Sequence, residues 1–346
     1  MTRREFGFGL GVTAALPLHS RAAALPGIIE IGSRRELFVD HELIAALQGA
    51  ELRLGSPIDA GPVLQLDRPW EGAFCGYTTI IHDEGRYRAY YRGVPVSGQD
   101  GNKGEVTCYA ESADGIRWSR PDLHLFDVHG STANNVILAN DPPFSHNFSP
   151  FLDTRPGVSA SQRYKAVAGV EKTGLMGFVS ADGLRWTKVR QQPVLPAPKE
   201  FALDSQNLAF WSEHESKYVL YYRTWKKMGK TGYRWVSRAT SDNFLDWTPE
   251  GEMSYGEAPP EHLYTNQTSA YFRASHIYTA ICARFMPGRQ VLSDAEAKAL
   301  RVDPGYFKDC SDAVFVTSRG GTQYTRTFLE AFLRPGVGFE NWVSRS

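Results

Sequence analysis

A seven-residue phrase recurs three times along the chain, and this repeat limits the possible folds more than any other feature. Each copy begins with Ser, contains Asp followed by Gly or Asn, and ends with Trp, at residues 112–118, 180–186 and 241–247. A weaker fourth copy occupies residues 318–324. The copies lie roughly 60 to 80 residues apart. Repeats with such a period predict a modular array, and in an all-β chain the leading expectation is a propeller.

Strand-like segments precede each copy of the phrase in the same order. An apolar opening segment comes first, at residues 76–81, 147–152, 207–211 and 268–272. A Tyr-rich segment follows, at residues 86–92, 164–168, 217–223 and 276–281. Residues 341–346 resemble the opening of a fifth unit. The sequence therefore predicts an all-β, five-bladed β-propeller whose fifth blade is incomplete at the C-terminus, unless strands around Leu37 close the ring.

The repeated phrase itself has a structural interpretation. Asp-Gly favours a tight turn, Ser and Asp side chains bond to backbone groups of such turns, and Trp can pack between neighbouring blades. Residues 289–300 interrupt the rhythm and predict an insertion. Its second half has helical composition, with Ser293 as the expected N-cap before Asp294 and Glu296.

The N-terminus has the pattern of an export signal. Arg3 and Arg4 precede Phe6, residues 7–18 are mildly apolar, and residues 22–24 are three alanines. We expect a twin-arginine signal peptide at 1–24 and one domain at 25–346, with the mature protein periplasmic or secreted. The apolar stretch is too short to span a bilayer, so no membrane insertion is expected after cleavage. A disordered basic start is the alternative interpretation.

Charge and cysteine content exclude several classes of function. The chain has 38 basic and 38 acidic side chains and no long run of one sign, which argues against nucleic-acid binding. No cysteine spacing fits a zinc site. Disulfides within Cys75–Cys108 and Cys282–Cys310 and buried free thiols remain equal alternatives.

Polar residues just before the opening strands are the candidates for chemistry. In a propeller these strands line one channel, so residues far apart in sequence meet at its mouth. Three acids from three units, Glu71, Asp204 and Glu261, supply the carboxylates that glycosidic cleavage requires. Turns, salt bridges and contacts between blades are the structural alternative for each. The expected sugar-binding residues are Asp67, Trp70, His146, Asn147, Gln206, Asn207, His262 and Asn266.

A metal site is a weaker interpretation of these residues. His146, Asp204 and His262 could converge on a cation, but no short His-containing pair supports one. We expect no metal and no organic cofactor.

Four motifs together resemble exported bacterial members of the five-bladed β-propeller glycosidases, the superfamily of glycoside hydrolase families 32, 43, 62 and 68. They are Trp70-Glu71-Gly72, the segment 146–153, the segment 204–207 and Pro259-Pro-Glu-His262. The resemblance implies Glu71 (or Asp67) as nucleophile or base, Asp204 as transition-state stabiliser and Glu261 as general acid. The Trp-Met-Asn-Asp-Pro-Asn-Gly signature of invertase-like members is absent.

The resulting hypothesis is a glycoside hydrolase acting on oligo- or polysaccharides, furanosides among them. A carbohydrate-binding propeller without catalysis is one alternative. A glycoside phosphorylase is another, and it would need a basic phosphate pocket that Arg68, Arg92 or Arg345 could supply.

Overall fold

The computed structural model describes residues 28–72, 75–94, 101–198, 201–301 and 307–336. The chain divides into two units, 1–34 and 35–346, and the account below concerns the second. The predicted signal peptide at 1–24 and the start of a fifth unit at 341–346, with Arg345, lie outside the described residues. Both stay predictions.

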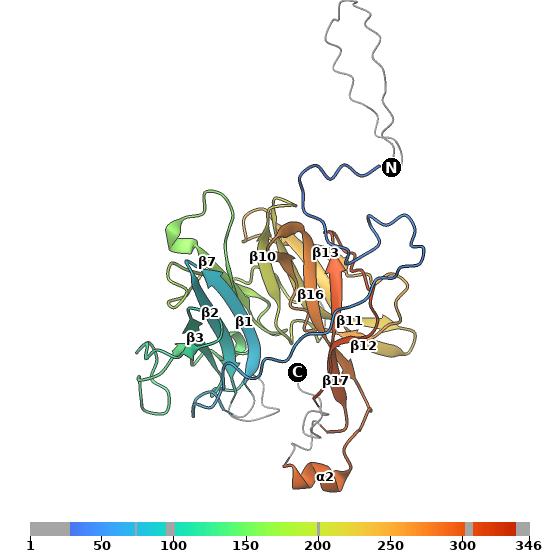
Figure 1. Cartoon of the computed structure of the whole chain (residues 1–346). Coiled ribbons are helices and arrows are strands. Elements are labelled where there is room, and N and C mark those ends of the chain that lie inside the picture. The colour runs from blue at the N-terminus through green and yellow to red at the C-terminus, as the bar shows by residue number, and fades with distance from the viewer. Residues whose placement is uncertain (1–27, 73–74, 95–100, 199–200, 302–306, 337–346) are drawn as a thin grey trace, which may run out of the picture. The chain divides into compact units, whose positions relative to one another are not determined.

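The described part of the second unit contains four antiparallel sheets in chain order (Figure 1). The first sheet has β1 (Gly76–Asp83), β2 (Arg86–Gly93), β3 (Val106–Ser112) and β4 (Trp118–Ser119), with β5 (Val136–Leu138) beside β3. The second has β6 (Ser149–Leu152), β7 (Tyr164–Ala168), β8 (Met176–Ser180) and β9 (Thr187–Lys188). The third has β10 (Leu208–Ser212), β11 (Lys217–Met228), β12 (Thr231–Ser241) and β13 (Thr248–Glu252). The fourth has β14 (His262–Leu263), β15 (Ser269–Tyr271), β16 (Ala274–Met286), β17 (Cys310–Ser318) and β18 (Ala331–Leu333).

Helices are short in this fold. They are α1 (Pro142–Ser145), a 3-10 turn at Ala160–Gln162 and α2 (Asp294–Ala299). Ser293 caps α2 through a complete capping box with Glu296, which confirms the predicted insertion. Among the described residues, no helix has the length and apolar character needed to cross a bilayer.

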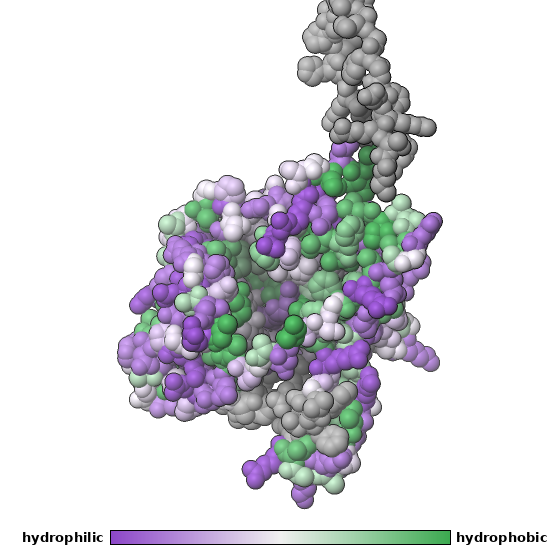
Figure 2. Space-filling model, viewed as in Figure 1, coloured by the Kyte–Doolittle hydropathy of each residue, from purple (hydrophilic) through white to green (hydrophobic). Residues whose placement is uncertain are grey.

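The all-β propeller prediction is confirmed, but the prediction of five blades is wrong for the described residues, which form four. The surface is hollowed between the first and fourth sheets (Figure 2). Residues around Leu37 form no strand. Residues 35–72, here called the strap, run instead as irregular chain from the fourth sheet to the first (Figure 1).

The strap is fixed at both ends. Arg319, which follows β17, forms ion pairs with Glu36 at 3.0 Å and with Asp40 at 2.8 Å. At the other end Leu64, Leu66 and Trp70 pack against the core of the first sheet. A polar latch and an apolar contact thus connect the first and fourth sheets.

Successive sheets pack face to face through shared apolar cores. One core joins the first and second sheets, another the second and third, and another the third and fourth. The repeated phrase closes a turn in each blade as predicted: Ser112 Oγ accepts from the Gly115 amide at 2.9 Å, and Trp118 Nε1 donates to the Gly115 carbonyl. Trp186 and Trp247 contact the cores between sheets, as expected of a residue that packs between blades.

Tyrosine hydroxyls form a second repeat that links neighbouring blades. Each donates from the second strand of one blade to a carboxylate at or just after the end of the first strand of the preceding blade. The pairs are Tyr164 with Asp83, Tyr218 with Asp153 at 2.6 Å, and Tyr278 with Glu215 at 2.6 Å. A cation also pairs with each carboxylate: Arg163, Lys165 and Arg238, respectively. We call these the inter-blade clamps.

Candidate functional site

A cluster of charged side chains lies where the inner strands of the blades begin. It contains Arg92 at the end of β2, Glu105 before β3, His146 before β6, Asp204 before β10 and Arg223 in β11. The first, second and third sheets each contribute at least one member. We call these five residues the charged cluster. The polar residues before β6 and β10 therefore meet as the sequence predicts.

His146 occupies the centre of the charged cluster and is 1% exposed. Its Nδ1 lies 3.3 Å from a Glu105 carboxylate oxygen, and its Nε2 lies 3.7 Å from Asp204 Oδ1. Burial lowers the pKa of His146, and so does the charge of Arg92, whose Nη1 lies 3.2 Å from His146 Nδ1. The nearby carboxylates of Asp204 and Glu105 outweigh both effects and raise the pKa to about 9. His146 is therefore a cation at neutral pH, held between two carboxylates.

Asp204 is the carboxylate of this cluster that reaches solvent, since 57% of its side chain is exposed. Arg223 Nη1 donates to Asp204 Oδ2 at 2.5 Å and to the Asp204 carbonyl at 2.6 Å. Burial would raise the pKa of Asp204, but the bond to His146 and the charge of Arg223 hold it below its usual value. Asp204 is thus ionised at neutral pH and positioned from two sides.

Gln206 follows Asp204 by two residues and is fully buried. Its Nε2 donates to the Tyr77 carbonyl at 3.1 Å and to Thr79 Oγ1 at 2.7 Å, both in β1. Its Oε1 accepts from Gln267 Nε2, in the segment before β15. One amide therefore joins the first, third and fourth sheets and forms the floor of the site.

Backbone strain gathers around the same floor. Tyr77, Leu203 and Gln267 all have positive φ, at 50°, 68° and 46°. Such angles are unfavourable for non-glycine residues, and they persist where surrounding contacts enforce them, often at functional sites. The three residues come from three blades, and Leu203 directly precedes Asp204.

Aromatic rings form a wall beside Asp204. The Arg223 guanidinium lies 5.6 Å from the Trp225 ring centroid and 5.8 Å from that of Tyr264. Phe201 contacts Trp225 edge to face and is 59% exposed. An exposed ring next to an ionised carboxylate is a surface on which a sugar ring can stack.

The side chains of the three predicted asparagines form hydrogen bonds with backbone groups and do not face the channel mouth. Asn147 Nδ2 donates to the carbonyls of Gly169, Leu203 and Ser205, so it ties the second blade to the loop of Asp204. Asn207 Oδ1 accepts a hydrogen bond from the Arg223 backbone amide. Asn266 Oδ1 accepts a hydrogen bond from the Thr268 backbone amide. All three are buried, and their contacts support the site from behind.

Glu71, Asp67 and Trp70 belong to a different environment. Glu71 is fully buried and accepts from Tyr91 Oη at 2.6 Å, from the Arg68 amide at 2.7 Å and from Arg120. Asp67 pairs with Arg120 too, and Trp70 Nε1 donates to Asn135. Because Tyr91 and Arg92 point to opposite faces of β2, the Glu71 carboxylate lies on the face away from the charged cluster.

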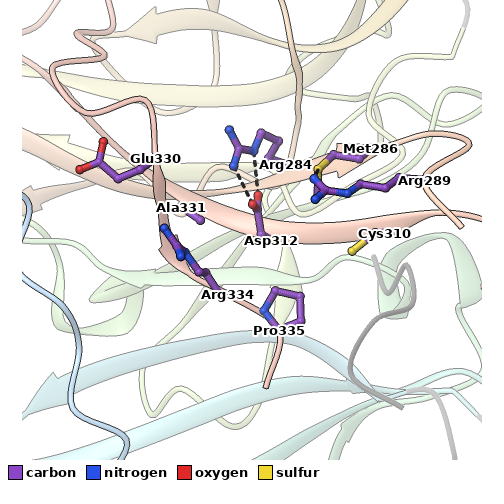
Figure 3. A pocket seen from close by; sticks show the side chains of 9 residues that line it. All are labelled: Arg284, Met286, Arg289, Cys310, Asp312, Glu330, Ala331, Arg334 and Pro335. Atoms are coloured by element: carbon purple, nitrogen blue, oxygen red, sulfur yellow. Dashed lines mark hydrogen bonds and ion pairs between the residues drawn. The ribbon is translucent and has the colours of Figure 1, made fainter. Parts of the chain in front are cut away.

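Glu261 is held by two arginines of the fourth sheet. Its oxygens accept from Arg284 and Arg326, each at 2.8 Å. Arg284 also forms two bonds with Asp312, and both line a cavity of about 310 Å³ between β16, β17 and β18 (Figure 3). The neighbouring His262 turns to the aromatic wall, with its ring 6.2 Å from Trp225.

The three predicted catalytic acids therefore occupy three separate environments. No hydrogen bond or ion pair in the described residues joins Glu71, Asp204 or Glu261 to one another or to a common partner. The geometry brings Asp204 together with His146, and leaves Glu71 and Glu261 inside ion-pair networks.

Sequence reasoning missed three members of the charged cluster as parts of one constellation: Arg92, Glu105 and Arg223. A signal for two of them was present, because Tyr-Tyr-Arg ends the second strand of both the first and third units, at residues 90–92 and 221–223. The described residues contain no group of three or more His, Cys, Asp or Glu that could hold a metal ion. No disulfide joins any two of the four cysteines, all of which the structure describes.

Comparison with known proteins bears on the fold. The sequence matches no protein-family model and no curated protein. It is similar to a solved structure described as a glycoside hydrolase, with a TM-score of 0.51 at 10% sequence identity over 76% of each chain. An alpha-L-arabinanase mutant from Cellvibrio cellulosa gives a TM-score of 0.45 at 11% identity, over 75% of this chain and 79% of the arabinanase. The first of these similarities shows that the chain shares the fold of that solved structure.

Proposed function

We propose that this protein is a glycoside hydrolase that binds a saccharide at the channel mouth beside Asp204. The observation that carries the proposal is the solvent-exposed, ionised carboxylate of Asp204 at the start of an inner strand. Its partner Arg223 lies against Trp225, which contacts the exposed ring of Phe201. The structural similarity to a glycoside hydrolase supports the same conclusion. Glycosidic cleavage uses carboxylates, and aromatic rings bind the apolar faces of sugars.

In this proposal the lowered pKa of Asp204 decides its part in the reaction. A carboxylate that is ionised at neutral pH acts as nucleophile, as base, or as stabiliser of an oxocarbenium-like centre, and not as proton donor. His146 is buried behind Asp204 and acts as a positioning residue, because its Nε2 fixes Oδ1 from the protein side. Arg223 fixes the second oxygen.

The direct test is reducing-sugar release from a panel of oligo- and polysaccharides by the wild type and by Asp204→Asn. We expect the variant to lose at least about 100-fold in kcat, since removing one preorganised electrostatic group costs about that much. Asp246→Asn is the matched control, because Asp246 is an exposed aspartate that pairs with Arg190 in a repeated turn. Full activity of Asp204→Asn would rule out the assignment.

A carbohydrate-binding propeller without catalysis is the second proposal. It is favoured by the ion pairs that occupy both oxygens of Glu261 and by the burial of Glu71. Tight glycan binding without turnover of any glycan would support it. Assays with and without inorganic phosphate separate both proposals from a phosphorylase.

We further propose that the chain is exported through a twin-arginine signal at residues 1–24, with Arg3 and Arg4 as the paired arginines. Cell fractionation of the wild type and of the double change Arg3→Lys, Arg4→Lys tests this. Equal amounts of exported protein from both would contradict it.

A further inference from the structure

The guanidinium of Arg234, in β12, lies against three aromatic rings and has no carboxylate partner among the described residues. The guanidinium carbon lies 4.1 Å from the ring centroid of Phe285, 5.4 Å from that of Tyr264 and 5.5 Å from that of Trp225. Within the same part of the chain this guanidinium forms no ion pair and no side-chain hydrogen bond; the bond that Arg234 makes runs from its backbone amide to His262 Nδ1.

This arginine belongs to the same wall as the cluster around Asp204. Arg223 and Arg234 share the rings of Trp225 and Tyr264, and both charges interact with Asp204. Arg234 is half-buried, and burial followed by the nearby charge of Arg223 lowers its pKa. A guanidinium has five N–H donors in a planar fork, so this one presents unsatisfied donors at the wall of the candidate site.

Two carboxylates influence the Arg234 guanidinium through space, Asp204 and Asp309, and neither forms an ion pair with it. Asp204 is already paired with Arg223, at 2.5 Å. The guanidinium of Arg234 therefore has no paired anion among the described residues.

We propose that Arg234 binds an anionic group of the substrate, so that the site takes acidic saccharides that carry a carboxylate or a sulfate ester. The inference rests on the proposed saccharide binding at Asp204 and names its substrate class. Arg is suited to this part because its planar fork matches the two oxygens of a carboxylate, and the ring of Phe285 fixes its plane. The anion would lie across the wall from Asp204, with the sugar ring between them.

The test is calorimetric binding of two matched pairs of probes. One pair is an oligogalacturonide and its carboxyl-reduced neutral counterpart; the other is a sulfated chondroitin oligosaccharide and its desulfated counterpart. We expect the wild type to prefer the charged member of at least one pair. The pair that shows the preference tells whether carboxylate or sulfate is the anion.

The variant Arg234→Met keeps an unbranched apolar stem against Phe285 and removes the charge. We expect it to weaken binding of the preferred anionic probe by about 10- to 100-fold, the range for a charge-assisted hydrogen bond, and to weaken binding of the neutral probe by much less. Arg234→Lys should retain part of the preference. Arg273→Met is the matched control, because Arg273 is exposed and stacks on Phe272 elsewhere in the fourth blade.

Two results would overturn the inference: no preference of the wild type for either anionic probe, or equal weakening of the charged and neutral probes by Arg234→Met. Because binding is read without turnover, the outcome is separable from the hydrolase proposal. Failure to release reducing sugar from any glycan would reject hydrolysis and leave the binding result intact.

Discussion

His146 shows how single residues acquire unusual properties in this fold. A buried histidine is normally neutral, since desolvation disfavours its charged form. Here Glu105 and Asp204 approach its two ring nitrogens, at 3.3 and 3.7 Å, and their charges prevail. The histidine therefore stores a positive charge inside the protein and keeps Asp204 ionised at the surface.

This pairing predicts a pH dependence of stability. Because the folded pKa of about 9 exceeds the unfolded value of about 6.5, the contribution of His146 is fully present below pH 6.5 and is lost as pH rises through 9. We expect the free energy of unfolding, measured with urea, to fall over this range in the wild type. The variant His146→Gln should show a shallower fall.

The exposed His129 provides the control for this experiment. His129→Gln should reproduce the wild-type slope between pH 6.5 and 9. A His146→Gln profile parallel to that of the wild type would contradict the assigned charge state.

The inter-blade clamps join the secondary-structure elements of neighbouring blades. Tyr218, at the start of β11, donates to the buried Asp153 that follows β6, and Lys165 neutralises the same carboxylate at 2.6 Å. The clamp fixes the position of one blade relative to the next. Apolar contacts alone do not, since they are nondirectional.

Removal of one hydroxyl tests the clamp. Tyr218→Phe leaves one bond fewer to a buried carboxylate, and we expect the unfolding free energy to fall by about 1.5–3 kcal/mol. Tyr222→Phe is the control, because Tyr222 is buried in the same strand and its hydroxyl makes no hydrogen bond in the described residues. Equal effects of the two changes would argue against a specific clamp.

The whole molecule is connected by the strap between its first and fourth sheets. Glu36 and Asp40 are nearly buried beneath Arg319, and His276 Nε2 also contacts Glu36, at 2.9 Å. Thr327 Oγ1 donates to the Val39 carbonyl at 2.9 Å. These contacts hold the N-terminal part of the unit on its last described sheet.

Arg319→Met should release this end of the strap, because two carboxylates lose their arginine partner. We expect faster hydrogen exchange in peptides that cover residues 36–47, measured by mass spectrometry, with the exchange of β7 and β11 unchanged. Arg273→Met again serves as control. Unaltered exchange at 36–47 would show that the latch does not hold the strap.

The repeats of the fold could be predicted from the sequence better than the charged cluster could. The turn phrase and the alternating strands are local patterns, so the all-β propeller, its blade boundaries and the capped helix at Asp294–Ala299 could be predicted. The strap could not be predicted, because the ion pairs that hold it on the fourth sheet join residues far apart in sequence and form no periodic pattern. Asp204 and His146 were found from their position before inner strands. Glu71 and Glu261 satisfied the same rule, but arginines distant in sequence, Arg120 and Arg284, decided their environment.

The ion pair between Asp40 and Arg319 spans 279 residues, and this separation determines when the fold can be completed. The first part of the strap, with Glu36 and Asp40, leaves the ribosome long before the fourth sheet that receives it is made. Each blade can then pack on its predecessor as it is made, since the apolar cores join consecutive sheets. Closing a loop of that length has a large entropic cost, which only a finished fourth sheet can offset. The part of this unit that is made first is therefore the last to dock.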